Sequence, residues 1–155
     1  MTTMHVKMIG AGTADWEKPV QISKDEWRAN YMTFLTMRYT LEDGRHIHVR
    51  TRYCGVDDIV LDGTVTGGFG HIEGQDEEGD WMFGRVDWEV RDDYQGGRYT
   101  FDGGTGKWER ASGVIHAPVW AVPEDHDQVM PPKGPIRFYG FIEGDGDLEL
   151  PGFER

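Results

Sequence analysis

Several stretches of the chain alternate apolar and polar residues with a period of two, which is typical of a β-strand with one buried face. One stretch runs from Tyr31 to Leu41 and the next from Arg45 to Tyr53, and the turn-forming sequence Glu-Asp-Gly lies between them. The two stretches are therefore predicted to form a hairpin whose other face is solvated. The apolar face consists of Thr33, Leu35, Met37, Tyr39, Leu41, Ile47, Val49, Thr51 and Tyr53.

The rest of the chain shows the same alternation in shorter pieces. Together with the hairpin they make about eight strands at short, regular spacing, joined by Gly-rich turns, which is the pattern of a β-sandwich or a barrel. A closed barrel removes exposed sheet edges. We therefore predict an all-β, closed antiparallel barrel of about eight strands, formed as a single domain by residues 1–155. The further strands are predicted at residues 59–66, 69–73, 81–91, 97–101, 111–121 and 136–143.

Two segments depart from the strand pattern. Residues Ser23 to Asn30 begin with a serine suited to cap a helix and carry acidic residues in the first turn, so they predict a short N-terminal helix or plug at one end of the barrel. Residues Pro123 to Pro135 combine prolines with acidic residues and are predicted to form an irregular loop between two strands.

The composition supports the β prediction and narrows the class of function. The 22 glycines and 12% aromatic residues suit short strands and tight turns. The formal net charge of -12 repels phosphate backbones and anionic lipid surfaces, so neither nucleic acid nor a membrane is an expected partner. Cys54 is the single cysteine, which excludes an internal disulfide, and no run of ~18 apolar residues is present to span a membrane. We expect a cytoplasmic protein.

The apolar face of each strand is expected to point into the barrel, because burial contributes ~25 cal/mol per Å² of apolar surface. The side chains of the aromatic residues on that face would then point into the lumen, together with His116 and the hydroxyl group of Thr51. Aromatic walls with few polar groups suit an apolar or aromatic ligand. The alternative is that these residues only fill a solid core. The predicted ligand-binding residues are Tyr39, Tyr53, Trp88, Trp120 and Phe138.

Charged residues occupy the opposite face of the strands, and two interpretations stay open. In the first they form a solvated outer face with cross-strand ion pairs. In the second, part of the set faces the lumen, where burial would raise the pKa of Asp87 or Glu89 and make it a general base. His116 is then a further group that can move a proton, and an arginine or Tyr139 can stabilise an oxyanion. The candidate catalytic residues are therefore Asp87, Glu89, His116 and Tyr139.

Neither a metal nor a cofactor is expected. His46 and His48 share one strand face, as two ligands of the metal-binding cupins do. Arg50 and Arg52 stand where a carboxylate ligand is expected, however, and their positive charge disfavours a cation. The serines lack the G-x-S-x-G elbow of an acyl-transfer nucleophile, and the Gly-rich stretch after Asp102 lacks the spacing of a phosphate-binding loop.

One stretch carries a recognisable motif, residues 96–113, which read GGRYTFDGGTGKWERASG. A tyrosine strand, the sequence GGTGKW and an Ala-Ser-Gly return into the next strand resemble a stretch common in bacterial relatives of the allene oxide cyclase and dirigent barrels. The flanking strands fit the same arrangement loosely, so the resemblance covers the second half of the chain. It implies an eight-stranded antiparallel barrel with an apolar lumen, a homodimer or homotrimer, and isomerase, cyclase or stereochemical guiding activity.

Two functions from different classes remain open at this point. The first is a cofactor-free isomerase, cyclase or lyase that acts on a small hydrophobic, oxygenated molecule in the lumen, with one carboxylate or histidine moving a proton. The second is a carrier that binds a similar molecule without chemistry. A buried carboxyl with a shifted pKa beside the ligand would favour the enzyme, and a lumen with only Tyr, Trp and aliphatic groups would favour the carrier.

Overall fold

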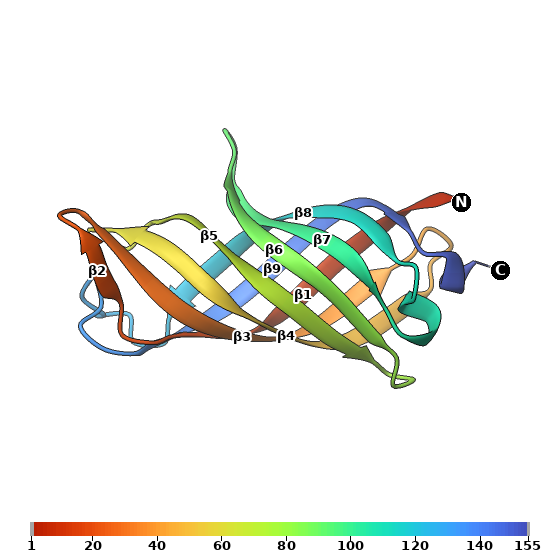
Figure 1. The fold of residues 1–155 in the computed structure, drawn as a ribbon, viewed down its shortest axis with the longest axis horizontal. Helices are drawn as coiled ribbons and strands as arrows, with labels where there is room; N and C mark the ends of the chain where they lie inside the picture. Colours follow the sequence, from red (N-terminus) through yellow and green to blue (C-terminus); the bar gives the residue numbers. More distant parts are fainter. Residues whose placement is uncertain (1, 155) are drawn as a thin grey trace.

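The structure, a computed structural model that describes residues 2–154, is a closed antiparallel β-barrel of eight strands (Figure 1). From β3 to β9 each strand pairs with the next one along the chain, β9 pairs with β1, and pairing of β1 with β3 closes the barrel. A short additional strand, β2 (Val20–Ser23), extends β3 at one end. The barrel strands are β1 (Thr3–Trp16), β3 (Glu26–Thr40), β4 (His46–Val60), β5 (Val65–Asp76), β6 (Trp81–Val90), β7 (Gln95–Gly104), β8 (Ser112–Pro123) and β9 (Ile136–Glu149).

The predicted hairpin is confirmed in both its register and its faces. Tyr39 of β3 pairs with Ile47 of β4, and the chain turns between them. Every second residue of both strands points into the barrel, and the nine residues assigned to the apolar face are buried or, for Tyr53, half-buried. The residues between them are exposed or, for Thr40, half-buried, since a period of two sends successive side chains to opposite sides of the sheet. The prediction of an all-β closed barrel is therefore confirmed.

The predicted N-terminal helix or plug is wrong. Residues Ser23 to Asn30 form the end of β2, a tight turn and the first five residues of β3. Within this segment Ala29 is fully buried and Trp27 is half-buried, so the segment continues the inward alternation of β3. The cap-like serine instead pairs with Glu26 across the turn of the β2–β3 hairpin.

Two other strand predictions also need correction. Residues 59–66 form the end of β4, a turn and the start of β5 instead of a separate strand. The first strand, β1, is absent from the predicted set, because glycines interrupt its apolar pattern. A Cβ at Gly12 would lie 1.9 Å from the carbonyl oxygen of Phe34, so the close approach of β1 to β3 excludes a side chain at this position.

One end of the barrel is filled by side chains, and both chain termini lie there (Figure 1). Two single-turn 3₁₀ helices, η1 (Gly106–Trp108) and η2 (Pro151–Phe153), lie at this end. Trp108 is completely buried, and its ring meets the ring of Phe153 edge to face at a centroid distance of 4.8 Å. Residues 2–154 contain no helix that is long and apolar enough to cross a lipid bilayer.

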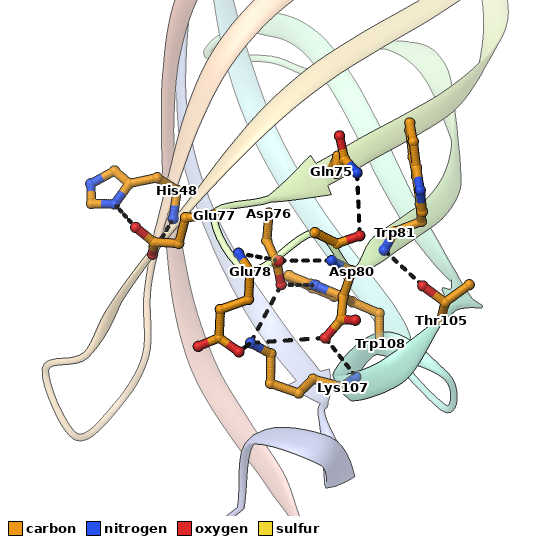
Figure 2. A network of polar contacts seen from close by, with 11 residues as sticks. His48, Gln75, Asp76, Glu77, Glu78, Asp80, Trp81, Thr105, Lys107 and Trp108 are labelled. Atoms are coloured by element: carbon orange, nitrogen blue, oxygen red, sulfur yellow. Dashed lines mark hydrogen bonds and ion pairs between the residues drawn. The ribbon is translucent and has the colours of Figure 1, made fainter.

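A buried carboxylate holds the filled end together (Figure 2). Asp76, at the end of β5, accepts hydrogen bonds from the indole N–H of Trp108 at 3.0 Å and from the backbone N–H groups of Glu78 and Asp80. Lys107 places its ammonium 3.6 Å away. Burial by itself raises the pKa of Asp76, but these hydrogen bonds and the lysine charge hold it below its usual value. The carboxylate is therefore ionised and ties the β5–β6 turn to η1.

Candidate active site

A cavity of about 290 Å³ lies inside the other end of the barrel. It lies between the main core and a smaller cluster that contains Trp16, Ile59 and Ile136. Exposed Gln95 belongs to its lining, so the cavity reaches solvent near the start of β7. Its size is at the lower limit of the ~300–1,000 Å³ typical of small-molecule sites. Its aromatic walls are formed by Trp16, Tyr31, Tyr53, Trp88, Tyr99 and Phe138.

Glycines in the strands make room for the large rings around this cavity. A Cβ at Gly97 would lie 2.5 Å from the ring of Tyr99, which lies over this position of β7. A Cβ at Gly70 of β5 would lie 2.2 Å from the hydroxyl oxygen of Tyr31, which reaches across from β3. These contacts show why the strands need glycine at both positions.

Asp57 is the one acidic residue that lines the cavity among the described residues. It is on β4, on the same face as Tyr53, and its Oδ2 accepts a hydrogen bond of 2.7 Å from the indole N–H of Trp16. Burial raises the pKa of Asp57 to about 7; the Trp16 hydrogen bond opposes this shift, and the charge of Asp58 adds to it. Near neutral pH the carboxyl group is thus present in both protonation states, which is what a group that takes up and returns a proton requires.

Three tyrosines of the cavity wall form a chain of rings. Tyr31 and Tyr53 meet edge to face at 6.0 Å between centroids, and Tyr53 and Tyr99 do so at 6.2 Å. The hydroxyl oxygens of Tyr53 and Tyr99 are 3.3 Å apart. Burial raises the pKa of Tyr53 to about 12 and those of Tyr31 and Tyr99 further above their usual value. All three side chains are neutral hydrogen-bond donors at physiological pH.

Three of the predicted ligand-binding residues line the cavity. They are Tyr53, Trp88 and Phe138. The indole N–H of Trp88 donates to the carbonyl of Val65 at 3.0 Å, which fixes its ring. Tyr39 also points inward, but it packs against Phe101 and Trp108 in the filled part of the barrel and does not line the cavity. Thr51 is likewise buried outside the cavity.

The expectation that Trp120 and His116 look into the lumen is wrong. Trp120 is 60% exposed, because β8 points its smaller residues inward at Ala117 and Val119. Tyr139 of β9 also faces outward and donates a hydrogen bond to Glu124. In these strands the period of two, and not the size of the side chain, decides which face is buried.

The predicted catalytic carboxylates lie on the outer face of the barrel as well. Asp87 pairs with Arg85 at 2.9 Å. Glu89 lies 2.7 Å from the Nδ1 of His116, and Arg91 is adjacent to both. Burial alone raises the pKa of Glu89, but His116 and Arg91 hold it below its usual value. The structure therefore brings two candidate residues, Glu89 and His116, together as a hydrogen-bonded pair outside the cavity, in agreement with the interpretation of a solvated, paired outer face.

No metal-binding arrangement is found in the cavity of the described chain. His46 and His48 face outward, where His46 pairs with Thr40 and His48 with Glu77. Asp125, His126 and Asp127 have ligand atoms within 4.8 Å of one another. All three are exposed in the β8–β9 loop, and exposed acidic groups are common without an ion.

Comparison with known proteins adds no family to this description. No family model matches the chain, and neither the curated proteins nor the solved structures contain a match. The fold and the cavity define the class: an all-β closed barrel that is filled at one end and has a small aromatic cavity with one carboxyl group at the other.

Proposed function

We propose that this protein is a cofactor-free isomerase, cyclase or lyase that transfers a proton within a small hydrophobic, oxygenated molecule held in the barrel. The observation that carries the proposal is the carboxyl group of Asp57, which lines an aromatic cavity and has a pKa of about 7. A carrier of apolar ligands gains nothing from such a group, because an ionisable carboxyl disfavours apolar binding.

The reaction begins when the Asp57 carboxylate takes a proton from a carbon atom next to an electron-withdrawing oxygen function. The electron pair of the broken C–H bond forms a C=C bond to the carbon of that function, and the π electrons of the function move onto its oxygen. The protonated Asp57 then returns the proton to another atom of the same molecule, which leaves an isomer and the original carboxylate. Trp16 acts as a positioning residue, since its indole N–H holds one oxygen of the carboxylate and leaves the other available.

Deuterium exchange tests this proposal whichever isomer the reaction forms. Small hydrophobic compounds with acidic C–H bonds are first screened for binding by quenching of tryptophan fluorescence, since Trp16 and Trp88 line the cavity. Those that bind are incubated with the protein in D₂O, and incorporation of deuterium is followed by NMR. Wild-type protein is expected to catalyse the exchange, and Asp57→Asn to slow it by about a hundredfold or more.

Asp87→Asn is the matched control, because Asp87 is an aspartate of another strand that lies on the outer face of the barrel. The Asp87→Asn variant is expected to catalyse deuterium exchange into the ligand at the wild-type rate. Ligands that bind without any exchange, or equal exchange by wild type and Asp57→Asn, would contradict the proposal and favour the carrier function.

A further inference from the structure

We infer that the hydroxyl groups of Tyr31 and Tyr53 bind the oxygen of the substrate, and that the substrate is an enolisable ketone or aldehyde whose enolate they stabilise. This inference rests on the proposed proton transfer by Asp57 and names the class of molecule on which it acts. It is carried by the placement of the tyrosines, which line the same cavity as the carboxyl group: Tyr31 lies on β3, and Tyr53 lies on β4, the strand of Asp57.

The hydroxyl group of Tyr31 is available to a ligand. The hydroxyl of Tyr31 makes no hydrogen bond to any other described residue, although its side chain is 9% exposed and lines the cavity. No buried side-chain oxygen of the described residues lacks a partner, so this hydroxyl is open to the cavity and its hydrogen-bonding capacity is not used by the protein. An oxygen atom of a bound molecule can accept its proton.

The hydroxyl group of Tyr53 can also donate its proton to a ligand. Its hydroxyl oxygen lies 3.3 Å from that of Tyr99, where either group can be the donor, and Thr33 is a further hydrogen-bonding neighbour. A phenolic hydroxyl has one proton to donate and lone pairs with which to accept. When Tyr99 and Thr33 donate to the Tyr53 oxygen, the proton of Tyr53 is left for a third partner in the cavity. In that arrangement two tyrosine O–H groups, one from β3 and one from β4, are available to a ligand in the cavity.

The charge of the cavity wall indicates which kind of ligand the site can hold. Asp57 is the only group of the described cavity wall that loses its proton near neutral pH, whereas burial keeps the tyrosines protonated. A ligand that arrives neutral and gives a proton to Asp57 acquires the negative charge that the carboxylate loses. The total charge of the buried site does not change, and the new oxyanion meets preorganised donors in an apolar environment.

These requirements select the ligand chemistry. The C–H bond that breaks must be adjacent to a carbonyl group, so that the electron pair is delocalised onto the carbonyl oxygen. The proton can return to the original carbon or to the far end of a conjugated enolate, which moves the double bond. The cavity volume of about 290 Å³ limits the molecule to a small ketone or aldehyde.

The test uses 4-nitrophenol, whose ionised form resembles an enolate and whose absorbance reports its ionisation. It is titrated into Asp57→Asn protein, in which the site has no competing negative charge, at a pH near that of half-ionisation of the phenol. We expect the bound probe to be ionised, and additional Tyr31→Phe or Tyr53→Phe substitution to weaken binding of the phenolate at least tenfold. Tyr139→Phe, which removes a hydroxyl on the outer face, is the matched control and should bind as before.

Binding of the neutral phenol, absence of binding, or equal affinity in the Tyr→Phe variants would overturn the inference. Each of these substitutions keeps the ring, and thermal unfolding checks that the variants remain folded. The two proposals fail separately: the proposed function fails if Asp57→Asn retains deuterium exchange. The tyrosine site fails if exchange depends on Asp57 but phenolate affinity does not depend on Tyr31 or Tyr53.

Discussion

At the scale of single residues, the molecule separates two kinds of carboxyl group by the face of the strand on which they lie. Asp87 and Glu89 face outward and form ion pairs with neighbouring basic side chains. Asp57 faces inward, has Trp16 as its hydrogen-bond donor and has no cation as a partner among the described residues. Desolvation therefore determines its protonation, and its chemistry differs from that of an ordinary surface aspartate.

The raised pKa of Asp57 predicts how activity depends on pH. Only the carboxylate can accept a proton, so exchange of deuterium into a bound ligand should rise as pH increases and level off above about 7. The measurement is the initial exchange rate by NMR across this range, after subtraction of the rate without protein. A rate that already levels off at the ordinary pKa of an exposed aspartate would show that Asp57 is not the base.

The site could be predicted from the sequence only in part. The alternation that assigned Tyr53 to the inner face continues through Gly55 to Asp57 and Ile59, so the parity alone would have found Asp57. The predicted strand ends at Tyr53, because the glycine and the two aspartates that follow look like a turn. Tyr31 lies two residues before Thr33 and therefore on the same, inward face of its strand. Which tyrosines contact one another cannot be predicted in this way, because Tyr53 and Tyr99 lie on strands far apart in the chain.

At the scale of elements, the β5–β6 turn and η1 act as one unit, because Asp76 accepts hydrogen bonds from both. Its burial requires this full set of partners, since an unpaired buried carboxylate is costly. At the start of η1, Gly106 has a φ of +52°, and a Cβ there would lie 2.3 Å from a carboxylate oxygen of Asp80. The GGTGKW motif of the sequence thus has a structural role at the filled end.

A pair of tryptophan substitutions should separate this end from the cavity. Trp108→Phe removes the indole donor to Asp76 and is expected to lower the free energy of unfolding by about 1–3 kcal/mol without changing ligand affinity. Trp88→Phe removes a comparable hydrogen bond in the cavity wall and should weaken ligand binding. Urea unfolding and fluorescence or calorimetric titration measure the two effects. Loss of binding in Trp108→Phe would mean that the two ends are coupled.

Strands are predicted well where apolar residues alternate without interruption and poorly where glycine replaces them. The β3–β4 hairpin is the favourable case. In β1 the inward positions Gly10 and Gly12 carry no side chain, because Met37 and the backbone of Phe34 fill the space. The alternation of apolar and polar residues that normally marks a half-buried strand is therefore interrupted in β1. The strand is nevertheless paired along its length with both neighbours.

At the scale of the whole molecule, the barrel combines a solid half with a hollow half. The main core is continuous from the 3₁₀ turns to Val86 and Tyr99, and small residues such as Ala14, Gly68 and Gly97 line the space beyond it. A barrel of eight strands is wide enough to be filled by side chains or to hold one small ligand. Here the number of strands permits both, and the distribution of large and small inward residues decides which occurs.

The stability of the barrel should depend on pH through Asp57. Its pKa is about 7 in the folded protein against 3.8 in an exposed chain, so the folded state binds the proton more tightly and stability falls as pH rises between these values. The slope is at most ~1.4 kcal/mol per pH unit. Asp76 has the opposite effect on stability. Its pKa is lowered in the folded protein, so the stability it contributes is lost as the pH falls and the carboxylate is protonated.

Urea unfolding of wild-type and Asp57→Asn protein at a series of pH values isolates this contribution. The difference in the free energy of unfolding between the two should grow from about pH 4 to about pH 7 in favour of the variant. Asp87→Asn serves as the control and should parallel the wild type. A constant difference between wild type and Asp57→Asn would contradict a raised pKa.

The start of β1 and the helix η2 lie at the filled end of the barrel (Figure 1), whereas the cavity lies inside the other end. A fluorescent reporter, an affinity tag or a solid support joined to either terminus therefore stands away from the ligand's route of access. On the proposed function, the molecule can be anchored through both of these ends at once while its cavity stays open to the surrounding solution. That geometry suits a biosensor or an immobilised catalyst, in which attachment must not compete with binding.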